Sequence, residues 1–258
     1  MSPHRPGLSD AQARFSLGDE ADEAEQPALA PGSRLPSYIR DHRARLRQRF
    51  SEGGAAALPD YELLELLLFR TLPRIDVKPL ARRLIDRFGD LAGVLAAPEA
   101  QLTAVEGAGP SVAQDLAIVA AAARRMTRAR VMNRQVISSW DALLDYCHMT
   151  MAHRETEQFR ILFLDRRNTL IADEEQARGT VDHVPVYPRE VVKRALELNA
   201  SALILVHNHP SGDPTPSPQD IAMTGQIRAA AEALGIQIHD HLIIGRSRET
   251  SFRSEGLL

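Results

Sequence analysis

The chain has 258 residues, of which 44% are hydrophobic and 25% charged, a composition typical of globular proteins and sufficient for one or two modest cores. No run of about 18 consecutive apolar residues occurs, and residues 1–26 lack the apolar centre of a secretory signal, so we expect a cytoplasmic protein that does not enter a membrane. The net charge of −3 divides unevenly, because residues 38–135 carry +5 while residues 136–258 carry −5, and this asymmetry favours an anionic partner for the middle segment.

The first segment, residues 1–37, is rich in glycine, proline, serine, alanine and acidic residues and shows no hydrophobic period. Such a segment buries too little apolar surface to offset the entropy of ordering it. We therefore predict a disordered tail over residues 1–37.

Residues 38–134 are predicted to form a helical domain. An arginine-rich helix is expected over residues 38–50, and Pro59 with the following acidic residues is typical of a helix start. The apolar run that follows indicates a buried helix. Further helices are expected over residues 77–88, with Gly89 directly after the end of that helix, and over residues 91–96.

Residues 102–113 resemble a helix-hairpin-helix motif. A short helix leads into Gly107 and Gly109, and a second helix is expected from about Ser111. The glycines permit a tight turn, and backbone N–H groups at the second helix can hold a DNA phosphate without reading a base. A hairpin used only for packing explains the same pattern, although the basic charge of the segment favours nucleic acid.

Residues 136–258 are predicted to form an α/β domain, because strand and helix patterns alternate. Ser139 is expected to cap a helix through Met149. A hairpin follows, with strands at 159–165 and 169–172, then a helix at 188–198, a strand at 202–206, a helix at 218–234, and two strands at 236–239 and 242–244.

The segment that carries chemistry begins where the strand at 202–206 reaches His207. His207 and His209 point the same way on an extended chain, and imidazole nitrogen is a preferred zinc ligand. A stiff proline-rich loop then delivers Ser217 and Asp220 to the start of the next helix. We predict that His207, His209 and Asp220 bind one zinc ion per chain and leave its fourth position open, as catalytic zinc sites do.

Glu157 and Ser217 are the predicted catalytic residues. Glu157 directly precedes a strand, and if that strand lies beside residues 202–206, its carboxylate can act as a general base beside the metal. Glu155 lies two residues away and remains an alternative, and solvated charges without a catalytic role also explain both glutamates. Ser217 is expected to donate a hydrogen bond to the developing oxyanion.

These residues resemble the JAMM, or MPN, metallopeptidase motif, in which an upstream glutamate precedes His-x-His, seven residues, serine, two residues and aspartate. The fuller text resembles the bacterial RadC family over roughly residues 38–258, on the segments 58–65, 76–78, 157–159, 164–168, 179–180, 188–190, 207–214, 240–241 and Gly245. The resemblance implies a cytidine-deaminase-like α/β core with a mixed sheet, a zinc site with the ligands given above, and an association with DNA repair.

Three functions follow as hypotheses. The first is a zinc-dependent peptide or isopeptide hydrolase that acts on a peptide or protein substrate. The second is a DNA-associated module, in which residues 38–134 bind DNA without sequence preference and the metal site is secondary. The third, hydrolysis of phosphodiester bonds, is disfavoured because no lysine or arginine clamp stands in the motif.

Several other polar residues leave alternatives open. Asp240 and His241 lie between two apolar runs and are explained either as a pair that supports a metal ligand or as a turn. Asp213 either orients a ligand or caps the proline-rich loop, and Arg189 either binds a substrate carboxylate or forms a structural ion pair. Cys147, the only cysteine, is interpreted as a half-buried structural thiol rather than a nucleophile.

Overall fold

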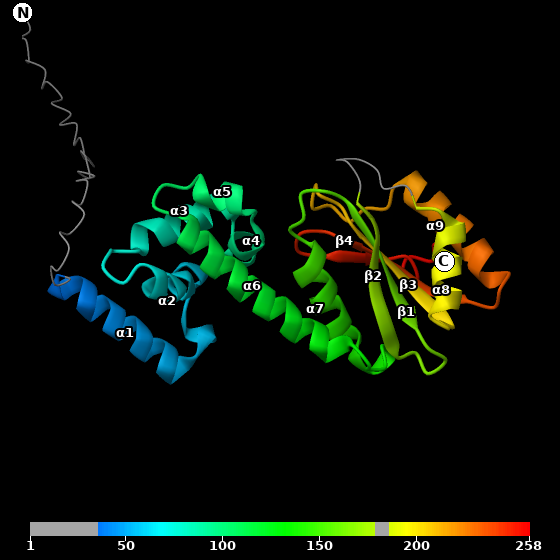
Figure 1. Ribbon diagram of the computed structural model, residues 1–258, viewed down its shortest axis with the longest axis horizontal. Coiled ribbons are helices and arrows are strands. Elements are labelled where there is room, and N and C mark those ends of the chain that lie inside the picture. The colour runs from blue at the N-terminus through cyan, green and yellow to red at the C-terminus, as the bar shows by residue number, and fades with distance from the viewer. Residues whose placement is uncertain (1–35, 179–185) are drawn as a thin grey trace, which may run out of the picture. The chain divides into compact units, whose positions relative to one another are not determined.

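The computed structural model describes residues 36–178 and 186–258, which form nine α-helices, two short 3-10 helices and one five-stranded sheet (Figure 1). The predicted disordered tail therefore lies outside the described residues except at its last two positions, as do Gly179 and Thr180 of the RadC resemblance. No helix within the described ranges is long and apolar enough to cross a membrane.

The N-terminal region is helical, as predicted. Its helices are α1 (Ser37–Gly53), α2 (Asp60–Thr71), α3 (Lys78–Phe88), α4 (Leu91–Ala96), α5 (Glu99–Thr103) and α6 (Pro110–Val131), with a 3-10 turn at Ala55–Ala57. Helix α3 ends at Gly89, whose φ of 93° favours glycine. The helices enclose one core, in which Leu64, Leu84 and Val94 are fully buried.

The C-terminal region is a sheet with helices on both faces. Its strands are β1 (Gln158–Leu164), β2 (Leu170–Arg178), β3 (Ala202–Asn208), β4 (Gln237–Ile244) and β5 (Glu249–Ser251), in the order β2-β1-β3-β4-β5. The sheet is mixed, because β3 and β4 are parallel while the other neighbouring strands are antiparallel. Helix α7 (Trp140–Met151) covers one face, and α8 (Pro188–Glu197) and α9 (Pro218–Glu232) cover the other (Figure 1).

Strand β3 separates two cores because its side chains alternate between the two faces. Ile204 and Val206 pack on the α7 side, whereas Leu203 and Leu205 pack on the α8 and α9 side. All seven residues of β3 are buried, as expected for a central strand covered on both faces. The same alternation places His207 on the α8 and α9 face.

Two predictions in this region are wrong. The strands expected at 236–239 and 242–244 are one continuous strand, β4. It continues through the polar pair Asp240 and His241 because both side chains are buried and hydrogen-bonded to residues of the neighbouring strands. Ser139 occupies the position before α7, but its hydroxyl donates to the carbonyl of Gln135 instead of capping the helix. The short strand β5 has no counterpart in the prediction.

Candidate metal centre

The three predicted metal ligands meet on the α8 and α9 face of the sheet. His207 is the sixth residue of β3 and fully buried, and His209 follows that strand directly. Asp220 lies in the first turn of α9 and is 7% exposed. Ligand atoms of all three side chains therefore come together from one strand end and one helix start, as the spacing predicts.

The distances between the ligand atoms fit one tetrahedral zinc ion. Nε2 of His207 lies 3.0 Å from Nε2 of His209 and 3.3 Å from Oδ1 of Asp220, and Nε2 of His209 lies 3.5 Å from Oδ2 of Asp220. A tetrahedral ion with ligands at about 2.0–2.1 Å separates those ligands by about 3.3–3.4 Å. The three separations bracket this value, with the two Asp220 distances measured to its two different oxygens, so the three side chains lie close enough to share one ion.

The hydrogen bonds behind His207 determine which of its ring nitrogens carries the proton. Thr224 Oγ1 donates its only proton to the carbonyl of Asp220 at 2.6 Å, so it accepts from Nδ1 of His241, also at 2.6 Å. Burial lowers the pKa of His241 well below its ordinary value, so this ring is neutral and its Nε2 carries a lone pair. That lone pair accepts from Nδ1 of His207 at 2.7 Å, so the tautomer of His207 that fits this hydrogen bond has its Nε2 lone pair facing the cluster.

His209 also carries its proton on Nδ1, although a different group accepts it. Its Nδ1 lies 2.7 Å from the backbone carbonyl of Asp213, which can only accept, so Nδ1 carries the proton. When the ring is neutral, its Nε2 therefore faces the cluster as a second lone pair. Of the two roles considered for Asp213, its backbone orients a ligand, while its carboxylate caps the loop through Thr215.

The carboxylate of Asp220 is held by the start of its own helix. Oδ2 accepts from the backbone N–H of Ser217 at 2.8 Å and from its hydroxyl at 2.7 Å, while Ser217 Oγ accepts from the N–H of Asp220. Burial opposes ionisation, but the imidazoles of His207 and His209, when they carry a proton on the nitrogen that faces Asp220, outweigh it and hold the pKa of Asp220 far below its usual range. The residue is therefore a carboxylate at neutral pH.

Two imidazole lone pairs and a carboxylate within 3.5 Å of one another repel unless a cation lies between them. A proton can relieve this repulsion, and the hydrogen bond to Asp220 accordingly raises the pKa of His209. A divalent ion relieves the repulsion more completely, since it contacts all three groups at once. The donor chemistry, two neutral imidazoles and one carboxylate, matches that of known catalytic zinc sites.

Glu157 lies on the same side of the sheet as the cluster. Strands β1 and β3 pair antiparallel with Phe159 opposite His207, and continuing that register sets Glu157 opposite His209. The negative charge of Glu157 is one of the causes that raise the pKa of His209, after the hydrogen bond to Asp220. Glu157 is half-buried, whereas the alternative base, Glu155, is exposed.

Two residues support the cluster: His241, for which this role is one of the two explanations left open by the sequence, and Thr224, which the sequence does not single out. His241 is fully buried beside His207, and Thr224 links His241 to the backbone of Asp220. Of the two explanations for Asp240 and His241, support of a ligand holds for the side chain of His241, whose backbone N–H also donates to the Asp240 carboxylate at 2.7 Å. Asp240 faces away and accepts from Ser251 Oγ and from the backbone N–H of Arg253.

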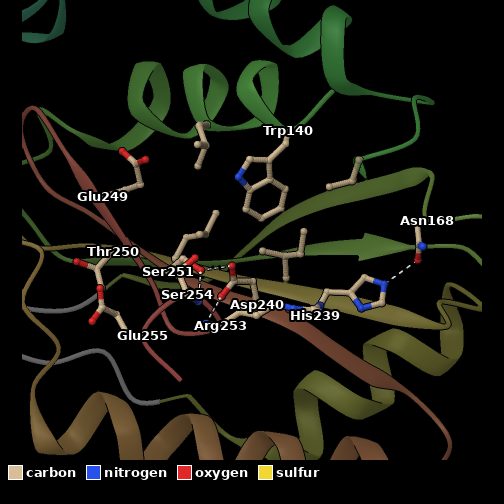
Figure 2. Close-up of a pocket in the computed structure, with 14 residues that line it drawn as sticks. Trp140, Asn168, His239, Asp240, Glu249, Thr250, Ser251, Arg253, Ser254 and Glu255 are labelled. Carbon is tan, nitrogen blue, oxygen red and sulfur yellow. Dashed lines mark hydrogen bonds between the residues drawn. The ribbon is translucent and has the colours of Figure 1, made fainter. Parts of the chain in front are cut away.

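A cavity of about 670 Å³ lies on the opposite face of the sheet, between α7 and the β4–β5 end (Figure 2). Trp140 of α7 and the apolar side chains Ile204 and Leu242 line it, and Asp240 with its partners forms a polar wall. None of its lining residues belongs to the metal cluster or to its supporting hydrogen bonds. The cluster therefore lies outside this cavity.

The glycines of the predicted hairpin lie in the turn between α5 and α6. Gly107 has a φ of 86°, which favours glycine, and Gly109 precedes the first residue of α6 with an extended backbone. Ser111 is exposed in the first turn of α6. The turn is thus formed as expected, but contacts of these three residues with DNA remain a prediction.

Cys147 takes the structural role expected for it, whereas the role of Arg189 stays a prediction. Cys147 is buried in α7, and burial raises the pKa of its thiol strongly, so a thiolate nucleophile is disfavoured. Arg189 is exposed at the start of α8 and forms an ion pair with Glu190 at 3.2 Å.

Comparison with known proteins identifies the family. The family model described as RadC-like JAB domain matches residues 137–257, and the one described as UPF0758 N-terminal matches residues 40–114. A UPF0758 protein of Ruegeria pomeroyi is 75% identical over 224 residues, 87% of this chain and 100% of that protein. This chain belongs to the UPF0758, or RadC, family. A UPF0758 protein of Rhodobacter capsulatus is also 75% identical, over 213 residues that make up 83% of this chain and the whole of that protein.

Membership of the RadC family confirms the fold class predicted from the sequence, a helical N-terminal region followed by a JAB, or MPN-like, α/β domain with a mixed sheet. The cluster of His207, His209 and Asp220 lies inside the JAB-like part and could hold a metal ion there.

Proposed function

We propose that this RadC-family protein is a zinc-dependent hydrolase that cleaves peptide or isopeptide bonds at the cluster of His207, His209 and Asp220. The observation that supports this most directly is the convergence of two imidazole lone pairs and a carboxylate at 3.0–3.5 Å, with both Nδ1 protons already donated elsewhere. The JAMM resemblance of the same residues points to the same chemistry.

When bound, zinc supplies Lewis acidity and lowers the pKa of a coordinated water towards neutrality. The residues around the ion provide the rest of the chemistry. Glu157, opposite His209 in the extended register, accepts the proton of the attacking water and returns it to the leaving amine. His241 and the carbonyl of Asp213 keep the two imidazoles in the tautomer that can bind a cation.

Ser217 has two roles to separate. Its hydroxyl donates to Oδ2 of Asp220 and so orients the carboxylate. Donation to a developing oxyanion requires that hydroxyl to rotate away from Asp220. If Ser217 assists only the oxyanion, Ser217→Ala lowers kcat and leaves zinc affinity intact; if it orients Asp220, zinc affinity falls as well.

The function is tested by loading the full chain with zinc and screening a library of internally quenched peptides together with a lysine-linked isopeptide probe. We expect cleavage that a chelator abolishes and zinc restores. Glu157→Gln should retain the zinc and lose activity, whereas Glu155→Gln, the matched control, should behave as wild type. Zinc-loaded wild type that cleaves none of these probes contradicts the proposal, as does full activity in Glu157→Gln.

A second candidate function is non-specific DNA binding by residues 38–134. Arg125, Arg128 and Arg130 project from the exposed surface of α6, and among the described residues their guanidinium groups have no ion pair or side-chain hydrogen bond. Exposed, unpaired guanidinium groups can contact phosphates. The two functions are compatible, since a DNA-docked hydrolase would use both regions of the chain.

A further inference from the structure

Asn208 lies between the two histidines in sequence but its side chain does not face the metal cluster. Side chains alternate along β3, so His207 faces α8 and α9 while Asn208 faces the other side. Asn208 is 1% exposed, so the polar atoms of its side-chain amide need hydrogen-bond partners inside the protein.

Both halves of the Asn208 amide bind the backbone of one neighbouring segment. Oδ1 accepts from the N–H of Gln158 at 3.0 Å, and Nδ2 donates to the carbonyl of Thr156 at 3.2 Å. These two partners are the residues immediately before and after Glu157. The two hydrogen bonds, called here the Asn208 bracket, therefore enclose Glu157 without touching its side chain.

The Asn208 bracket lies where the strand pairing stops. The paired residues of β1 and β3 run from Leu164 and Ala202 to Phe159 and His207, and go no further. Beyond that point the Asn208 amide takes over the hydrogen bonds that a ladder would otherwise supply. Thr156 is exposed and precedes the strand, so the Asn208 bracket fastens this stretch of backbone to the end of β3.

The chemistry of the Asn208 bracket requires asparagine. The group opposite Gln158 must accept, the group opposite Thr156 must donate, and both must branch from one carbon at the end of a short side chain. Aspartate has no donor for the Thr156 carbonyl and would face it with a negative charge. Alanine leaves a buried donor and a buried acceptor without partners.

We propose that Asn208 is a positioning residue, which holds the backbone on both sides of Glu157 so that this carboxylate faces the cluster of His207, His209 and Asp220. The proposal rests on the proposed function only for the role of Glu157 as base. The Asn208 bracket itself can be tested without catalysis.

The first experiment measures the Asn208 bracket directly, by amide hydrogen exchange of the full-length protein in the absence of substrate. Asn208→Ala should remove the protection of the Gln158 N–H, because its acceptor is gone. Gln158→Met is the matched control, since it removes the neighbouring side-chain amide and keeps the backbone N–H that Asn208 binds. Protection of Gln158 that is the same in Asn208→Ala as in wild type overturns the proposal, whatever the activity of the protein.

The second experiment asks whether Asn208 acts through Glu157. With the best-cleaved quenched peptide, Asn208→Ala and Asn208→Asp should lower kcat about 10- to 100-fold while KM and zinc content stay near wild type. Combining Asn208→Ala with Glu157→Gln should lower kcat no further than Glu157→Gln alone, because the carboxylate that Asn208 positions is already absent. A further loss in the double variant, or loss of zinc from Asn208→Ala, overturns the proposal and indicates general damage to the site.

The two experiments separate the possible failures. If zinc-loaded wild type hydrolyses no probe, the proposed function fails, and the exchange of Gln158 still decides whether the Asn208 bracket exists. If wild type is active and Asn208→Ala retains full kcat, the positioning inference fails while the proposed function stands.

Discussion

Replacing Thr224 by valine tests the hydrogen-bonded chain behind the metal cluster. Thr224 is 2% exposed and its hydroxyl makes two bonds of 2.6 Å, to His241 and to the carbonyl of Asp220. Valine has nearly the same shape, so the change leaves the Nδ1–H of a fully buried His241 without a partner. Such an orphaned group costs about 1–3 kcal/mol of stability. Each kcal/mol corresponds to roughly 2–4 °C in Tm for a protein of this size.

The same change should weaken zinc binding. Without Thr224 as acceptor, His241 is free to move its proton to Nε2, which then opposes the Nδ1–H of His207. His207 would adopt the other tautomer, with its proton on the atom that faces the cluster. Loss of such support around a metal ligand typically lowers metal affinity about 10- to 100-fold, or about 1.4–2.7 kcal/mol.

Two assays separate these effects. Urea unfolding of the metal-free protein gives the change in stability, and competition for zinc with a chromophoric chelator gives the change in affinity. Thr224→Ser, which keeps the hydroxyl, is the matched control and should bind zinc as wild type does. Wild-type zinc affinity in Thr224→Val would refute the proton assignment for His207 and His241.

Three further predictions concern other parts of the chain. The raised pKa of His209 stabilises the metal-free fold at low pH, so this stabilisation is present below about pH 6.5 and is lost as the pH rises through the raised pKa. The difference in unfolding free energy between wild type and His209→Gln should therefore shrink with rising pH. A difference that stays constant with pH argues against the pairing of His209 with Asp220. Cys147 should resist iodoacetamide in the folded protein and react only on unfolding, and mass spectrometry that finds rapid native labelling contradicts its burial. If α6 binds DNA, fluorescence anisotropy should show that DNA affinity falls as the salt concentration rises. Alanine at Arg125, Arg128 and Arg130 should reduce the slope of log binding constant against log salt concentration by about 0.9 for each phosphate that the variant no longer neutralises. An unchanged slope shows that these residues are not part of the interface.

The metal ligands can be anticipated from the sequence because their geometry is local. His207 and His209 share a face by strand alternation, and Ser217 and Asp220 share the first turn of α9 by helical spacing. The same reasoning predicts the helices, because apolar periods and proline or glycine boundaries are local signals. The role of Glu157 depends on which strand lies beside it, and the pairing of β1 with β3 supplies that neighbour.

The hydrogen bonds of the supporting residues cannot be derived from the sequence because their partners are distant in the chain. His241 meets His207 across 34 positions, and Asn208 meets Gln158 across 50. A polar pair inside an apolar run looks like a turn, so the sequence predicts two strands where β4 continues through Asp240 and His241. Burial of both residues is tolerated because hydrogen bonds to residues distant in the chain satisfy their polar groups. The hydrophobic periodicity of the sequence contains no information about such bonds.

The central claim is that His207, His209 and Asp220 hold one divalent ion, and elemental analysis of the purified chain beside His209→Ala tests it most directly. We expect about one zinc per chain in wild type, as purified or after mild loading, and little or none in the variant, with both proteins folded by circular dichroism. A wild-type protein that neither carries nor takes up zinc, or a variant that keeps it, contradicts the account.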